Sequence, residues 1–160
     1  MSEPQSNAVR HVTWQASVTN RFGRGIATEI GNTHEDNPNV NLKQRTFTGE
    51  DAGKQADQSV DLLNNIIGRH LGENNPNASQ KYLAISALEL FHTEGLYTAT
   101  EHKNKEGEIT SVTIGKTRLT DKEYKSAMKR LNETDKDGFS KAQLEKQASD
   151  FQKERNMVIK

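Results

Sequence analysis

Apolar residues recur at helical spacing along residues 7–95, and this periodicity is the feature that most constrains the fold. Only 31% of the residues are hydrophobic and the mean hydropathy is −0.92, so the few apolar side chains must share helix faces to build a core. The spacing predicts four helices that are separated by glycine and proline. Their apolar stripes consist of Val9, Val12 and Ala16; Ile26, Ala27 and Ile30; Ala56, Val60, Leu63 and Ile67; and Tyr82, Ile85, Leu88 and Phe91.

The pattern changes after Gly95. Residues 96–100 and 109–114 are rich in β-branched side chains and flank a stretch with the composition of a hairpin loop. Further on, Thr120 with Glu123 and Ser140 with Gln143 are typical of capping boxes, which predict two more helices.

We therefore expect a mainly α protein with about six helices and one β-hairpin. The chain is predicted to form a single domain over residues 1–160. Its parts would be a helical core with the site over 7–95, the hairpin over 96–119 and a C-terminal helix pair over 120–160.

Charge and cysteine content exclude several classes of function. The 22 basic and 22 acidic residues give a formal net charge of zero and are interspersed, which argues against a nucleic-acid interface. The absence of cysteine excludes a disulfide framework, a thiol nucleophile and thiolate metal sites. No apolar run is long enough for a membrane-spanning helix, and the first residues lack the features of a signal peptide.

Reactive side chains concentrate on the first three predicted helices. His11 lies on the first, His34 and Glu35 end the second, and Asp61 lies on the third. One interpretation is a metal site in which His11, His34 and Asp61 hold a divalent cation such as Zn or Ca, with Glu35 as general base. In a metal-free interpretation Glu35 is a general acid whose pKa is raised by Trp14 and the apolar stripe, and Asp61 is the second carboxylate.

A second pattern lies between the last two predicted helices. Asp135, Asp137 and Gly138 have the spacing of the start of an EF-hand calcium loop, but Leu144 occupies the twelfth position, where a glutamate is needed. Two interpretations stay open, a structural turn and a weak calcium site.

Three short motifs resemble a bacterial family of domains of unknown function that occurs alone and at the C-termini of wall-associated and polymorphic-toxin proteins. They are Arg-His-x-x-Trp, a His-Glu pair after the next helix, and Asp-x-x-Asn-Asn-x-x-Gly-Arg, and the match covers about residues 7 to 72. The resemblance implies a bacterial effector or toxin domain. The site residues that it implies are Asn7, Arg10, His11, Trp14, His34, Glu35, Asp61, Asn64, Asn65, Gly68 and Arg69.

From these patterns we expect a secreted antibacterial effector that hydrolyses a cell-envelope component such as peptidoglycan. Glu35, His11 and Asp61 would be catalytic, and the substrate would contact Arg10, Trp14, Asn64, Asn65 and Arg69. Such an effector would be made in the bacterial cytoplasm and exported by a specialised secretion system to the target-cell periplasm, with an immunity protein and a secretion component as partners. The alternatives are a non-catalytic binding module and a metal-dependent hydrolase of another substrate, such as lipid or nucleic acid.

Overall fold

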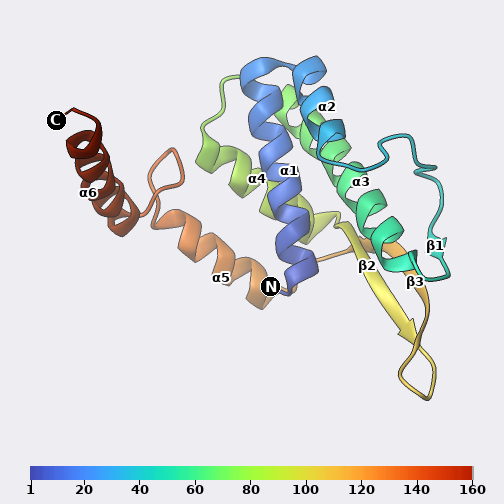
Figure 1. The fold of residues 1–160 in the computed structure, drawn as a ribbon. Coiled ribbons are helices and arrows are strands. Elements are labelled where there is room, and N and C mark those ends of the chain that lie inside the picture. Colours follow the sequence, from blue (N-terminus) through green and yellow to red (C-terminus); the bar gives the residue numbers. More distant parts are fainter. Residues whose placement is uncertain (160) are drawn as a thin grey trace.

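The computed structural model describes residues 1–159, and this range contains six helices and a three-stranded antiparallel sheet (Figure 1). The mainly α fold predicted from the apolar periodicity is therefore confirmed. The helices are α1 (Glu3–Phe22), α2 (Arg24–Thr33), α3 (Ala52–Asn74), α4 (Gln80–Thr93), α5 (Asp121–Asn132) and α6 (Lys141–Val158), and the strands are β1 (Thr46–Phe47), β2 (Leu96–Lys103) and β3 (Ile109–Thr117).

The sheet has the order β1-β3-β2 and contains the predicted hairpin as β2 and β3. The short strand β1 lies in a segment for which the sequence predicts only a loop, and it pairs Thr46 with Thr113 and Phe47 with Val112. Phe47 is 4% exposed and packs with Val112 and other residues of α3 and the sheet. One buried aromatic side chain thus fixes an otherwise polar loop to the edge of the sheet.

Glycines bring α1 and α3 unusually close together. A Cβ atom on Gly68 would lie 2.5 Å from the backbone oxygen of Val12, and one on Gly72 would lie 2.4 Å from the backbone oxygen of Ala16. Two glycines four residues apart therefore leave part of one face of α3 without side chains, and the backbone of α1 packs directly against it. This close approach places the polar side chains of both helices within hydrogen-bonding reach.

The apolar core has two parts. One joins α1, α4 and α5 around Phe91, and the other joins α3 to the sheet around Phe47. The buried face of α4 differs from the predicted stripe, because Tyr82 is 51% exposed whereas the neighbouring Leu83 is fully buried. The 3.6-residue period was identified correctly, but the start of the stripe was placed one residue too early.

Both predicted capping boxes are present at the starts of α5 and α6. Helix α5 packs on α4, where the ring of His92 stacks on that of Tyr124 at 4.4 Å between centroids. Helix α6 buries none of its residues and stands apart from the other helices (Figure 1). Among the helices of residues 1–159, none combines the length and apolar character required to cross a bilayer.

Candidate functional site

A buried histidine on α1 contacts two polar side chains of α3. His11 is 6% exposed; its Nδ1 lies 2.9 Å from Asn65 Oδ1, and its Nε2 lies 3.4 Å from Asp61 Oδ2. Because the amide oxygen of Asn65 can only accept, Nδ1 carries the hydrogen of this bond. Nε2 is then the nitrogen that can exchange a proton with Asp61.

Asp61 is further held by α1. Asn7 Nδ2 donates to Asp61 Oδ1 at 2.8 Å, and Arg10 in turn donates to Asn7 Oδ1. Burial raises the pKa of Asp61, while the charge of His11 and the hydrogen bond from Asn7 act in the opposite direction. Asp61 is thus held by hydrogen-bonding side chains of α1.

Glu35 follows α2 and is the carboxyl group with the most distinctive environment. Its side chain is half-buried, and its Oε1 is a buried atom without a hydrogen-bond partner. Burial, followed by the negative charge of Asp61, raises the pKa of Glu35 from 4.5 to about 6. The raised pKa predicted for Glu35 is thus present, and removal of water from around the carboxyl is its main cause.

Three aromatic rings connect the end of α2 to α1. The ring centroids of His11 and Trp14 lie 6.1 Å apart, those of His11 and His34 lie 6.0 Å apart, and those of Trp14 and His34 lie 5.9 Å apart. His34 is exposed, Trp14 is half-buried and His11 is buried, so the three rings form one cluster between the surface and the interior.

The donors predicted for a metal do not form a ligand group. Over residues 1–159, no set of three His, Asp or Glu side chains is clustered for one ion. The reason is visible at His11, since Asn65 and Asp61 face its two ring nitrogens. The arrangement of His11, His34 and Asp61 therefore fits proton transfer better than coordination.

Two of the residues predicted to contact substrate, Asn64 and Arg69, connect elements of the fold. Asn64 is fully buried, and its amide group bonds both the backbone oxygen of Tyr97 at 2.9 Å and its backbone nitrogen at 3.1 Å. Arg69 is 8% exposed and donates to the buried Gln15 at 3.1 Å. A polar residue that connects two elements has the same sequence pattern as a residue that binds a ligand, so the sequence alone does not separate the two roles.

The calcium-loop pattern forms a turn in which one oxygen of Asp135 already accepts two backbone hydrogen bonds. Asp135 Oδ1 accepts from the backbone nitrogens of Asp137 and Phe139, each at 2.9 Å. Lys81 Nζ donates to the backbone oxygen of Thr134 at 2.7 Å, so an ammonium group already lies on this loop. These contacts favour the structural interpretation.

The sequence analysis missed a large groove beside the site. It lies between α1 and α5, above α4, and Trp14 and Arg10 line it together with residues of α5 such as Arg130. The sequence analysis finds the basic and acidic residues interspersed, and no sequence pattern indicates that α5 faces α1.

The fold and the site together define the class of protein. It is a small, mainly α domain in which three helices surround a histidine–carboxylate pair beside a protonatable glutamate. The chain belongs to the family described as Domain of unknown function (DUF6973), which matches residues 1–95. The matched segment contains α1 to α4 and with them the site, whereas the hairpin, α5 and α6 lie beyond it. Comparison with curated proteins gave no match, and neither did comparison with solved structures.

Proposed function

We propose that this protein hydrolyses a glycan of the bacterial cell envelope with Glu35 as general acid. The observation that carries the proposal is the half-buried Glu35 carboxyl, which has a buried oxygen without a partner and a pKa of about 6 beside the charged Asp61. A carboxyl whose pKa lies near 6 keeps a useful protonated fraction near neutral pH and can still release its proton.

In this mechanism Glu35 donates its proton to the glycosidic oxygen as the bond from that oxygen to the anomeric carbon breaks. A water molecule attacks the anomeric carbon, and the proton that the water loses is taken by Asp61. As a neutral imidazole with its hydrogen on Nδ1, His11 can then accept this proton from Asp61 through Nε2, which lies 3.4 Å from Asp61 Oδ2. Asn65 holds the imidazole in the orientation that this transfer requires.

The choice of a glycan rests on three observations. The net charge of zero disfavours a polyanion such as nucleic acid. Trp14 lies at the entrance to the site and offers an aromatic face for a sugar ring. The motif resemblance to domains of wall-associated and toxin proteins supports an envelope target, and with it export to a periplasm and neutralisation by an immunity protein.

The test is digestion of purified peptidoglycan, with mass spectrometry of the released fragments. We expect new reducing ends with the wild type and at least a hundredfold slower release with Glu35→Gln, because a general acid contributes about 10²- to 10⁴-fold. Glu29→Gln, an exposed glutamate on α2, is the matched control and is expected to retain the wild-type rate. Equal rates in both variants, or no glycosidic cleavage by the wild type, would contradict the proposal.

One observation favours a second candidate, a non-catalytic binding module. The hydrogen bonds from Arg10 through Asn7 and Asp61 to His11 connect α1 to α3, and a network of this kind can exist to fix helix packing. If this is its role, His11→Ala lowers the melting temperature while Glu35→Gln leaves toxicity in the periplasm intact. Under the hydrolase proposal, Glu35→Gln abolishes toxicity without unfolding the protein.

A further inference from the structure

The groove beside the site is formed by two helices that start together and then diverge. Helices α1 and α5 begin side by side and separate over α4, which forms the floor (Figure 1). The cavity between them has a volume of about 1060 Å³, which is at the upper end for small-molecule sites. It therefore has room for a ligand larger than a single sugar.

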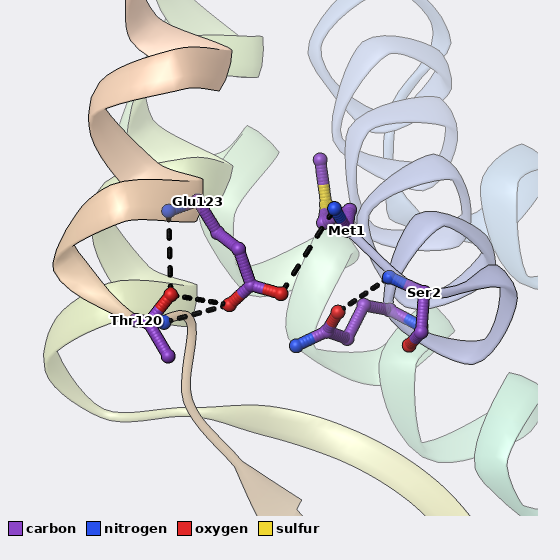
Figure 2. A network of polar contacts seen from close by, with 5 residues as sticks. Met1, Ser2, Thr120 and Glu123 are labelled. Atoms are coloured by element: carbon purple, nitrogen blue, oxygen red, sulfur yellow. Dashed lines mark hydrogen bonds and ion pairs between the residues drawn. The ribbon is translucent and has the colours of Figure 1, made fainter.

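One polar contact joins the starts of the two helices, where the nitrogen of Met1 lies near Glu123 of α5 (Figure 2). Glu123 accepts from the backbone nitrogen and the hydroxyl of Thr120 at 2.9 and 2.8 Å, and the nitrogen of Met1 lies 3.9 Å from its other oxygen. These hydrogen bonds lower the pKa of Glu123. The carboxylate is thus mainly engaged in capping α5.

The remaining charges of the groove are positive. Among its lining residues within 1–159, the basic side chains are Arg10 on one wall and Lys122 and Arg130 on the other, and Glu123 is the one acidic residue. Short aliphatic side chains lie between these walls, namely Val9, Ala84, Leu88, Ala127 and Leu131. A complementary ligand carries carboxylates and small apolar groups.

The groove adjoins the candidate site through Trp14 and Arg10, whereas Asn7 and Asp61 line a separate pocket. Trp14 lines the groove, and its ring is in edge contact with the rings of His11 and His34. Arg10 also lines the groove and bonds Asn7, which in turn bonds Asp61. A sugar bound against Trp14 would therefore lie beside the rings of His11 and His34.

We propose that this groove binds an acidic glycopeptide, with the peptide's carboxylates on Arg10 and Arg130, its short aliphatic side chains on the floor and the attached sugar against Trp14. This inference rests on the proposed function and names the substrate class for the same site. A peptide-bearing glycan strand of the envelope has this combination of groups. A neutral glycan would offer no carboxylate to Arg130 or to Arg10, which already donates to Asn7, and a long acyl chain would not offer one at each wall.

The test is a binding assay that does not depend on turnover. The chain contains one tryptophan, so the fluorescence of Trp14 reports directly on the groove. The probes are disaccharide–tetrapeptide fragments of peptidoglycan and a chito-oligosaccharide with the same number of sugars, each titrated into Glu35→Gln protein. Arg130→Ala is expected to weaken binding of the acidic fragment about tenfold, as loss of one charge-assisted contact does.

Two further variants control this result. Lys105→Ala removes an exposed charge from the hairpin loop and should leave affinity unchanged, whereas Ser126→Phe should fill the groove and abolish binding without disturbing the core. Equal affinity for the neutral chito-oligosaccharide, an unchanged affinity in Arg130→Ala, or binding only to phosphatidylglycerol vesicles would overturn the glycopeptide proposal. If Arg130→Ala hydrolyses peptidoglycan with an unchanged KM, the groove proposal is contradicted while the proposed hydrolase function stands. If the fragment binds in an arginine-dependent way but is not hydrolysed, the hydrolase function is contradicted while the groove proposal stands.

Discussion

Substituting alanine for Gly68 tests how the close approach of α1 and α3 builds the site. The added Cβ would lie 2.5 Å from the backbone oxygen of Val12 and 2.8 Å from Cβ of Gln15, whereas ordinary contacts begin at 3.4 Å. The nearer of these atoms is backbone, so no side-chain rotation relieves the clash. Helix α1 must therefore move away from α3 by a sizeable part of an ångström.

The expected cost follows from two opposing effects. Overpacking of this kind destabilises a protein by about 1–3 kcal/mol, while replacing glycine by alanine within a helix stabilises it by up to about 1 kcal/mol. Gly53→Ala on the same helix isolates the second effect, because nothing lies within 4 Å of its added Cβ. For a chain of this size, Gly68→Ala should melt roughly 2–12 °C below Gly53→Ala.

The assay is thermal unfolding followed by circular dichroism, combined with the rate of peptidoglycan digestion. Movement of α1 also separates His11 from Asn65 and Asp61, so Gly68→Ala should lose activity at temperatures where it is still folded. A melting temperature equal to or above that of Gly53→Ala would refute the argument that this contact positions the site.

Three more predictions follow from the same contacts. Asn64→Leu leaves the backbone groups of Tyr97 without their buried partners and should lower the free energy of unfolding by about 2–4 kcal/mol in urea titration, whereas an unchanged value would refute the structural role. Because folding raises the pKa of Glu35 above 4.5, its stabilising contribution is present below pH 4.5 and lost as pH rises through about 6. The free energy of unfolding of the wild type should therefore fall by about 1 kcal/mol relative to that of Glu35→Gln between pH 4.5 and 7, after allowance for solvent screening of the half-exposed carboxyl. Parallel profiles of unfolding free energy against pH for the two proteins would contradict this. Calcium at about 1 mM should leave the melting temperature unchanged, since Lys81 already contacts the loop at Thr134, and a rise of several degrees would show a calcium site.

The helices and the hairpin could be predicted because their signals are local. The capping boxes at Thr120 and Ser140 depend on residues three positions apart, and the apolar stripes depend on the 3.6-residue period. Strand β1 could not be predicted, because its pairing with β3 joins residues that are 65 or more positions apart, and a two-residue strand has no period of its own.

Part of the site could also be predicted from local patterns, whereas the parts that depend on how the helices pack could not. The proximity of His11 to Asp61 follows from two helix faces that the sequence marks as polar beside apolar, so their partnership was foreseeable. Nothing local distinguishes Asn64, which holds β2, from Asn65, which holds His11, since adjacent helix positions point about 100° apart and only the packing decides their neighbours. The groove depends on where α5 lies relative to α1, which no sequence pattern records.

The central claim is that burial between the first three helices keeps the Glu35 carboxyl protonated to a higher pH than usual, so that it can act as an acid. The most direct measurement is an NMR titration of the Glu35 side-chain carboxyl carbon, assigned by comparison with Glu35→Gln. We predict a midpoint at a pKa of about 6. A midpoint at the ordinary value of 4.5 would contradict the claim.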